Sequence, residues 1–174
     1  MRLMDPERSV LVLVDYQQRL LPAIHRGAEV LAQAVRIADV AREIGVPVYG
    51  IEQNPQAIRS RSSSTLVKTH FDACADGLLE LLPLDGSKAA REIVIAGCEA
   101  HVCLLQTALG LLCADLRVSV IAQASGSRTA ENHEFAMQRL RQAGCEIVSV
   151  EMVAFEWLRH CGHQRFKPVL KLLK

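Results

Sequence analysis

The amino-acid sequence predicts an α/β protein, a three-layer α/β/α sandwich around a central, mainly parallel sheet. Three observations predict this class. Short apolar runs rich in β-branched residues alternate with longer segments whose apolar residues follow the helical period. The run at residues 10–14 is uninterrupted, as expected of a strand that is buried on both faces. Strands that alternate with helices form right-handed βαβ units, which place helices on both faces of a parallel sheet.

The predicted elements follow one another in a regular order. The first helix has its apolar residues on one stripe and ends at Gly45, and Asp72 is a candidate N-cap for the second helix. The polar segment 52–65 is typical of a loop. We expect strands at 10–14, 46–51, 66–67, 93–96, 116–122 and 147–150, and helices at 28–44, 72–82, 100–114 and 131–143, followed by a helical tail after residue 151.

Length and composition limit the class of protein. The chain has 174 residues, of which 50% are hydrophobic, so we expect a single domain over residues 1–174. Its 20 basic and 19 acidic residues give a net charge of +1, and 4% of the residues are aromatic. We therefore expect neither nucleic acid nor a membrane surface as a partner. The first apolar run is too short for a signal peptide, which predicts a cytoplasmic protein with mostly reduced cysteines.

The sequence lacks the motifs of several common sites. Neither G-x-G-x-x-G nor G-x-S-x-G occurs, which argues against a dinucleotide fingerprint and a serine-hydrolase elbow. Gly86-Ser87-Lys88 resembles the end of a phosphate loop, but Leu81 stands where its first glycine would be. No C-x-x-C pair occurs, and we interpret the His and Cys residues at 160–163 as a polar helix junction rather than a metal site.

Three reactive side chains follow predicted strands or lie in the turn after one. Asp15 ends the first strand, where a carboxylate is costly unless it is paired. Lys68 follows a short strand and can supply the paired cation. Cys103 lies in the first turn of a predicted helix, where the backbone amides, the helix dipole and a nearby lysine favour a thiolate. This is the minimum set for covalent catalysis, although a capping aspartate, a surface lysine and a buried thiol would give the same pattern.

A resemblance to a known family makes the catalytic interpretation stronger. Residues 97–108, GCEAHVCLLQTA, resemble the nucleophile motif of the isochorismatase-like cysteine hydrolases. Residues 12–17, VLVDYQ, look like their aspartate strand, and residues 67–71, VKTHF, look like their lysine segment. The likeness continues through 52–55, 125–128 and 166–167, so it covers nearly the whole chain. It is strongest to the isochorismatase-domain-containing branch.

The resemblance implies a catalytic triad. Cys103 would be the nucleophile, Asp15 the general base, and Lys68 the group that orients and supports both. The family forms a covalent acyl-enzyme, here a thioester, which water then hydrolyses. The resemblance also implies a cis peptide bond between Cys98 and Glu99. The backbone amides of Glu99 and Cys103 would then form the oxyanion hole.

Departures from the family pattern bear on the metal and the substrate. Nicotinamidases of this superfamily hold a metal through an Asp-x-His segment and further histidines, whereas residues 52–65 contain no histidine and no aspartate. We therefore expect no metal and no cofactor. Gln17 and Gln53 are candidates for substrate contact. Gln123 stands where the family often has aspartate, and the sequence assigns it no role.

Several neighbouring residues have competing interpretations. Arg128 is a candidate for binding an anionic group and equally for a structural salt bridge. We expect His101 to pack at the start of its helix or to contact another subunit, rather than to act as a further base. We expect Cys98 and Cys145 to be buried packing thiols.

The function expected from these observations is metal-independent hydrolysis of a small amide or related carbonyl compound by a homo-oligomer. Two alternatives stay open. The pocket could hydrolyse the enol ether of isochorismate with Asp15 as acid-base and Cys103 idle. The chain could instead be a non-catalytic oligomeric binding protein. A run of leucines would suit either a subunit contact or the core: Leu104, Leu105, Leu109, Leu111 and Leu112.

Overall fold

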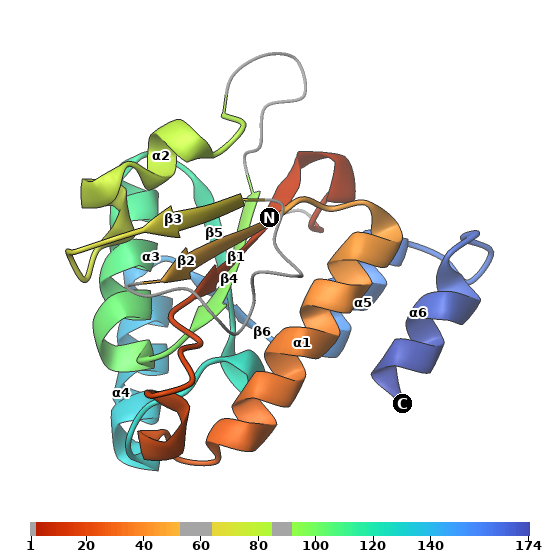
Figure 1. Ribbon diagram of the computed structural model, residues 1–174. Helices are drawn as coiled ribbons and strands as arrows, with labels where there is room; N and C mark the ends of the chain where they lie inside the picture. The colour runs from red at the N-terminus through yellow and green to blue at the C-terminus, as the bar shows by residue number, and fades with distance from the viewer. Residues whose placement is uncertain (1–2, 53–63, 85–91) are drawn as a thin grey trace.

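A central parallel sheet confirms the predicted α/β/α class. The structure, a computed structural model, describes residues 3–52, 64–84 and 92–174. Within these residues, six strands form one sheet in the order β3-β2-β1-β4-β5-β6, and each neighbouring pair is parallel (Figure 1). The strands are β1 (Ser9–Val14), β2 (Val48–Glu52), β3 (Ser64–Val67), β4 (Glu92–Gly97), β5 (Arg117–Ile121) and β6 (Glu146–Val148).

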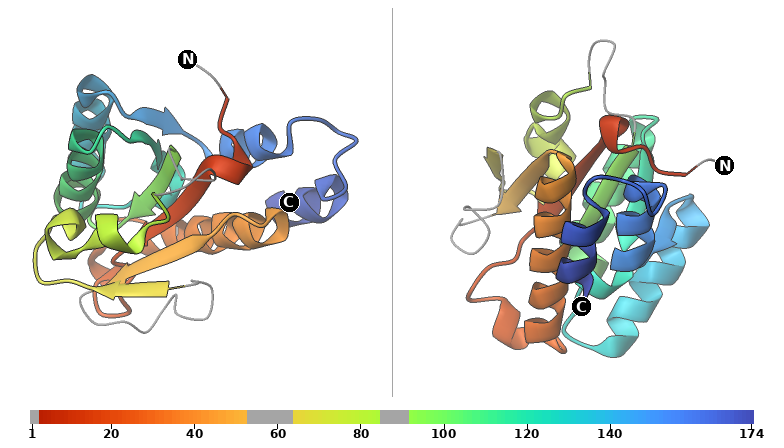
Figure 2. Two further views of the ribbon diagram at one scale, coloured as in Figure 1. Left: turned by 90° about the horizontal axis from the view of Figure 1, so that it is seen from above. Right: turned by 90° about the vertical axis from the view of Figure 1, so that its right-hand side faces the viewer.

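Helices cover both faces of this sheet (Figure 2). One layer holds α1, α5 and α6, and the other holds α2, α3 and α4. The helices are α1 (Gly27–Ile44), α2 (Leu78–Leu81), α3 (Leu105–Cys113), α4 (Ala130–Ala143), α5 (Val150–Leu158) and α6 (Phe166–Leu173), with short 3-10 segments η1 (Pro6–Arg8), η2 (Leu21–Ala23), η3 (Ala73–Asp76) and η5 (Ala122–Ala124), and a π-helical turn η4 (Ala100–Leu104). None of the helices in the described part of the chain has the length and apolar character that crossing a membrane requires.

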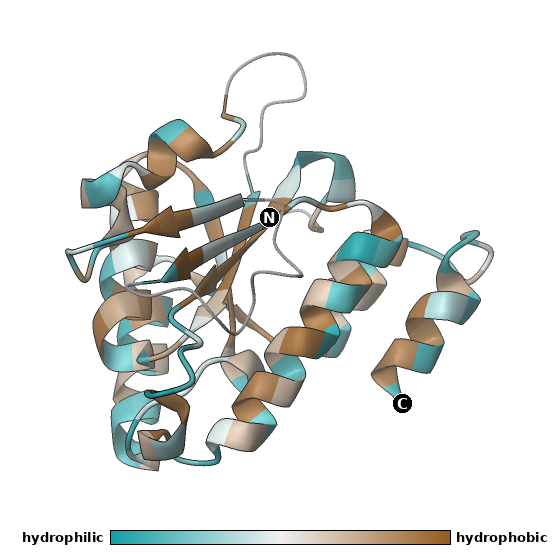
Figure 3. Cartoon of the chain, viewed as in Figure 1, coloured by the Kyte–Doolittle hydropathy of each residue, from teal (hydrophilic) through white to brown (hydrophobic). Residues whose placement is uncertain are grey.

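The central strand β1 separates two hydrophobic cores. Leu11 and Leu13 pack on the side of α1 and α5, while Val10, Val12 and Val14 pack on the side of α3. Successive side chains of a strand point to opposite faces, so an uninterrupted apolar run is what a strand between two helical layers needs. Figure 3 shows the strands as mainly hydrophobic, whereas the helices carry both hydrophobic and hydrophilic residues.

Two predicted helices differ from the observed ones. The helix expected at 72–82 is divided into η3 and α2, because Gly77 between them adopts a left-handed conformation with φ of 95°. Asp72 does cap η3, since its side chain accepts a hydrogen bond from the backbone N–H of Cys74 at 2.8 Å. The helix expected at 100–114 begins with the π-helical turn η4, and regular α-helix starts at Leu105.

The strand order places a crevice between β1 and β4. From β1 the chain adds β2 and β3 on one side, and from β4 it adds β5 and β6 on the other. Ligands of such sheets bind where the order reverses, at the carboxyl ends of the strands. Gly97, the last residue of β4, allows the close approach of the two strands there: a Cβ atom at this position would lie 2.5 Å from the Val14 carbonyl oxygen.

Candidate active site

Asp15 is the first residue after β1 and it is almost fully buried. Its φ of 54° lies in the left-handed region, which aspartate adopts more readily than most residues. Its backbone N–H donates to the carbonyl oxygen of Ile51 at 2.8 Å, so the residue stays anchored to β2 as the strand ends. Its side chain, 3% exposed, forms an ion pair with Lys68, in which Nζ lies 2.8 Å from Oδ2.

Lys68 directly follows β3 and reaches Asp15 from two strands away. Its backbone N–H donates to the Glu52 carbonyl oxygen at 3.4 Å, which continues the β2–β3 ladder by one residue. Its side chain is 0% exposed, and Nζ also donates to the His70 carbonyl oxygen at 3.1 Å. A buried ammonium group needs such partners, because desolvation of an unpaired charge is expensive.

Cys103 completes the cluster from the π-helical turn η4. Its thiol is buried and lies within hydrogen-bonding reach of both the Asp15 carboxylate and the Lys68 ammonium group. Burial raises the pKa of Cys103 to about 11, and the charge of Asp15 adds to this increase while Lys68 opposes it. The resting thiol is therefore protonated at neutral pH. This corrects the expectation that the helix turn and the lysine would favour a thiolate, because burial and the carboxylate outweigh them.

The segment that leads to Cys103 is held by backbone contacts on both sides. The peptide bond between Cys98 and Glu99 is cis. The N–H of Cys98 donates to the Val14 carbonyl oxygen at 2.9 Å, which ties the segment to the end of β1. The N–H of Ala100 donates to the Gly126 carbonyl oxygen at 2.6 Å, which ties it to the loop after β5.

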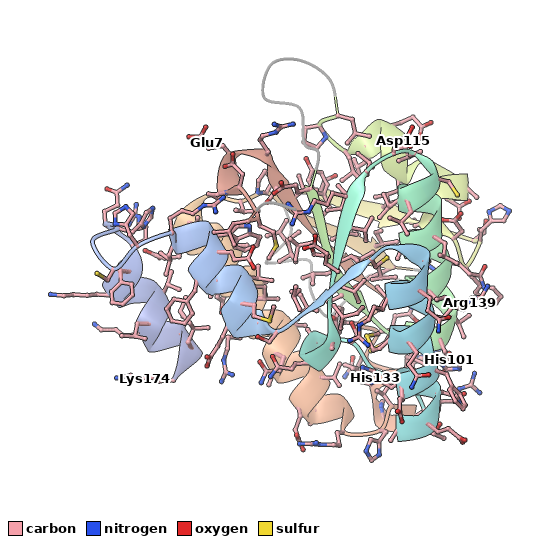
Figure 4. All side chains as sticks on the ribbon, turned by 180° about the vertical axis from the view of Figure 1, so that it is seen from behind. Glu7, His101, Asp115, His133, Arg139 and Lys174 are labelled. Carbon is pink, nitrogen blue, oxygen red and sulfur yellow. The ribbon has the colours of Figure 1, made fainter. Side chains whose placement is uncertain are left out.

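Side chains of the loop before α4 also hold this segment. The exposed Arg128 forms an ion pair with Glu99, with Nε 2.5 Å from Oε1. His101 Nδ1 lies 3.0 Å from the hydroxyl oxygen of the buried Ser127. Figure 4 shows His101 at the end of the molecule where α4 begins. Of the two roles considered for Arg128, the structure shows the salt bridge, and the His101 contact fits packing at the helix start.

The three glutamines singled out from the sequence have different positions. Gln17 donates from Nε2 to Asp15 Oδ1 at 3.1 Å, so it contacts the carboxylate of the cluster. Gln53 lies outside the described residues. Gln123 accepts a hydrogen bond from the backbone N–H of Val150 at 3.0 Å and so caps the start of α5. This contact depends on a helix that is distant in the sequence.

Sequence reasoning missed Thr107, a fully buried residue of α3. Its hydroxyl accepts a hydrogen bond from the Ala73 N–H at 3.1 Å and donates to the Phe71 carbonyl oxygen at 3.4 Å. These bonds attach the stretch just after Lys68 to the helix that follows Cys103. A polar residue within an otherwise apolar helix face was the available signal, because buried hydroxyls are retained where they have partners.

A separate cavity of about 400 Å³ lies at the same edge of the sheet. It is lined by the first residues of α1 and α4 and by the loop after β5, including His25, Gln123 and His133, and the three clustered side chains are not among its lining. Figure 4 shows His133 on the first turns of α4. Within the described ranges, no group of three or more His, Cys, Asp or Glu side chains is arranged to hold a metal ion. We place the candidate active site at Asp15, Lys68 and Cys103.

The fold and this cluster define a doubly wound α/β protein with polar groups at its switch point, the arrangement of many α/β enzymes. The isochorismatase domain matches residues 9–152, and the chain therefore belongs to the isochorismatase family of hydrolases. It is 30% identical over 176 residues to isochorismatase domain-containing protein 2A of Mus musculus, an alignment that covers 97% of this chain and 84% of the mouse protein.

Solved structures share the fold. The MAR1 ribonuclease of Caenorhabditis elegans superimposes with a TM-score of 0.89 at 26% identity, covering 99% of this chain and 92% of that chain. The YcaC gene product of Escherichia coli, described as an octameric hydrolase of unknown specificity, superimposes with a TM-score of 0.86. Its identity is 19%, with 99% of this chain and 90% of that chain covered, so the likeness concerns the fold alone.

Proposed function

We propose that this protein is a metal-independent cysteine hydrolase that cleaves a small amide or a related carbonyl compound through a thioester on Cys103. The observation that carries the proposal is the meeting of a thiol, a carboxylate and an ammonium group from segments that follow three different strands. The side chains of Asp15 and Lys68 are 3% and 0% exposed, and the thiol reaches both. Keeping two buried charges beside a thiol is costly for a purely structural role.

The raised pKa of Cys103 determines the first step. A thiol with a pKa of about 11 attacks slowly unless its proton is removed as the bond forms. The Asp15 carboxylate is within reach to accept that proton while Sγ adds to the substrate carbonyl carbon. Lys68 balances the negative charge that Asp15 and the Cys103 sulfur share during this step, since its ammonium group contacts both of them. The proton then passes from Asp15 to the leaving amine, and the thioester remains.

The backbone near Glu99 supports an oxyanion hole. Its N–H donates to no acceptor among the described residues, and it lies in the segment that is fixed to β1 and to the loop after β5. We propose that this N–H and that of Cys103 receive the oxyanion of the tetrahedral intermediate. Each such donor contributes about 3 kcal/mol to barrier reduction in other enzymes. In the second half-reaction a water molecule, deprotonated by Asp15, attacks the thioester; the C–S bond breaks, the acid leaves, and the proton passes from Asp15 back to the Cys103 sulfur.

We also propose that the protein forms a homo-oligomer. Three of the five leucines considered as a subunit contact, Leu104, Leu105 and Leu111, are buried in the core beneath α3, so that run is explained mainly by packing. The octameric state described for the YcaC protein supports a homo-oligomer here. The name of the nematode neighbour suggests ribonuclease activity, but a net charge of +1 does not favour a polyanionic substrate.

The test is to trap the acyl group on the predicted cysteine. The protein is incubated at pH 7 with p-nitrophenyl acetate and with a set of small amides, and the adduct is located by mass mapping. We expect acyl-Cys103, no acylation of this position in Cys103→Ala, and a rate about 10²–10⁴-fold lower in Asp15→Asn, because a general base is lost. Cys145 is the matched control, because burial also raises its pKa to about 11 but without a contribution from Asp15 or Lys68. Cys145→Ala should therefore keep full activity.

The alternative functions give different results in this experiment. Enol-ether cleavage of isochorismate that survives in Cys103→Ala but not in Asp15→Asn would show that the thiol is idle. Equal acylation of Cys103 and Cys145 would show that the carboxylate does not activate the thiol. Either outcome contradicts the proposed mechanism. An unreactive wild-type protein that still forms oligomers would favour the binding protein.

A further inference from the structure

The loop that follows Lys68 is held by a single carboxylate. Asp76, at the end of η3, accepts hydrogen bonds through Oδ2 from the backbone N–H of Thr69 at 2.7 Å and of His70 at 2.8 Å. Its other oxygen, Oδ1, lies 2.8 Å from His70 Nδ1 and 3.3 Å from the Thr69 hydroxyl. The Asp76 side chain is 16% exposed, so this acceptor is largely covered although its donors are exposed.

These contacts are unlike those of an ordinary helix cap. An N-cap side chain binds the N–H groups of its own helix, and η3 already has that cap in Asp72. The four hydrogen bonds described above for Asp76 come from the two residues that follow Lys68. Two of them come from backbone N–H groups, so they persist whether or not His70 is protonated. Hydrogen bonds from His70 and Thr69 hold the pKa of Asp76 well below its usual range, which keeps the carboxylate ionised.

The loop in turn holds the lysine. The His70 carbonyl oxygen accepts a hydrogen bond from Lys68 Nζ at 3.1 Å, on the same ammonium group that pairs with Asp15. An ammonium group has three donors, and these two contacts fix its direction. If the backbone at Thr69 and His70 moved, the His70 carbonyl oxygen in the following peptide unit would move away from Nζ, and the long lysine side chain would lose that contact.

We infer that Asp76 is a positioning residue for Lys68: by binding the Thr69 and His70 N–H groups, it aims the His70 carbonyl at Nζ and so holds the ammonium group against Asp15 and Cys103. The consequence for catalysis rests on the proposed function, whereas the positioning of the lysine does not. Loss of Asp76 would leave the sheet and Cys103 in place while the cation became mobile.

The first experiment observes the lysine itself. In protein with 15N-labelled lysine, we expect a slowly exchanging ammonium signal for Lys68, because its Nζ is buried and bonded. Asp76→Ala should abolish that signal and raise the amide exchange rates of Thr69 and His70. Asp76→Asn should retain both, since its carbonyl oxygen still accepts the two backbone N–H groups. The matched control is Asp72→Ala, which removes a cap from the same η3 segment without touching the loop. Thermal melting of each variant establishes that it is folded, and Asp76→Ser replaces the alanine variant if that one is not.

The second experiment measures acylation of Cys103 in the same set of variants. We expect a loss of roughly tenfold in Asp76→Ala, as small misplacements of catalytic groups produce, and a near-normal rate in Asp76→Asn and Asp72→Ala. An unchanged Lys68 signal in Asp76→Ala, or equal losses in the Asp76 and Asp72 alanine variants, would overturn the inference. If Lys68→Met has no effect on acylation, the proposed function fails in its lysine role, while the ammonium signal still decides the role of Asp76.

Discussion

At the scale of single residues, Asp15 has two opposite effects on Cys103. Its negative charge helps to raise the pKa of the thiol, which makes the resting nucleophile less reactive. Its carboxylate is also the nearby group that is able to accept the thiol proton. The two effects are compatible when proton transfer and attack occur together, because no free thiolate then has to accumulate. In the proposed mechanism, the orientation of the carboxylate is therefore more important than the resting charge of the sulfur.

Gln17 is the residue whose substitution tests this orientation. Gln17→Leu removes the donor to Asp15 Oδ1, and a hydrogen bond to a charged group contributes about 1.5–3 kcal/mol. We expect kcat to fall about tenfold or more while KM stays nearly constant, measured by steady-state kinetics on the amide identified by the acylation screen. The exposed neighbour Gln18 provides the control, and Gln18→Leu should have little effect. A rise in KM with unchanged kcat would instead assign Gln17 to substrate binding.

At the scale of elements, the junction between β4 and η4 is the least tolerant part of the site. A Cβ atom added at Gly97 would meet the Val14 carbonyl oxygen at 2.5 Å and the Val14 Cβ at 2.6 Å. Because the obstacle is backbone of the neighbouring central strand, the clash is relieved only when β1 and β4 move apart. Asp15 and Cys98 directly follow these two strands, so the movement would separate the base from the nucleophile segment.

Gly97→Ala is accordingly expected to lower both stability and activity. We predict a loss of roughly 1–3 kcal/mol in the free energy of unfolding, measured in urea, as overpacked cores show. The rate of Cys103 acylation should fall by a larger factor than the fraction of folded protein does. Gly144→Ala is the comparison, because its positive φ also makes alanine unfavourable but the space around its Cβ is open, so it should lower stability without slowing acylation by the folded protein. An equal loss of acylation in the two variants would mean that the crowding between β1 and β4 is not important.

The sequence predicted the elements of this fold better than their internal geometry. Apolar runs and the helical period located each strand and the long helices, because burial on one or two faces leaves a repeating pattern. The π-helical turn η4 was not predictable, since its apolar residues fit a regular helix over 100–114 equally well. The break at Gly77 was missed because one glycine within a helical pattern is often tolerated.

The candidate site was predictable to a similar extent. Strand ends indicated Asp15 and Lys68, the first turn of a predicted helix indicated Cys103, and the resemblance to a family implied the role of each. The hydrogen-bond partners of Asp76, Thr107 and Gln123 come from segments that meet only through tertiary packing, so the sequence could not assign these contacts. The predictions of a single domain, a cytoplasmic location and a substrate contact at Gln53 stay predictions.

At the scale of the whole molecule, buried thiols make stability depend on alkaline pH. Burial raises the pKa of Cys103 and Cys145 to about 11 and that of Cys74 and Cys98 to about 12. Unfolding returns each thiol to its ordinary pKa of about 8.5. Between these values the folded state binds more protons than the unfolded state, so stability must fall as the pH rises.

We therefore expect the free energy of unfolding to be level near neutral pH and to decrease from about pH 8.5 towards pH 11. Urea titrations at a series of pH values measure the slope. Cys145→Ala should flatten it, because one of the four contributing thiols is removed, whereas substitution of the exposed Cys113 should not. A slope that is the same in both variants would show that another titrating group causes the alkaline loss.

The protonated state of the resting nucleophile also affects the chemical durability of the protein. Peroxides and alkylating agents consume thiolates, and a thiol with a pKa of about 11 presents very little thiolate in a neutral solution. In the proposed mechanism, Cys103 becomes strongly nucleophilic only towards a molecule that is held beside Asp15 long enough for the proton to move. The same burial that slows the sulfur at rest would then protect it from random damage, and reaction with the substrate would depend on binding at the site.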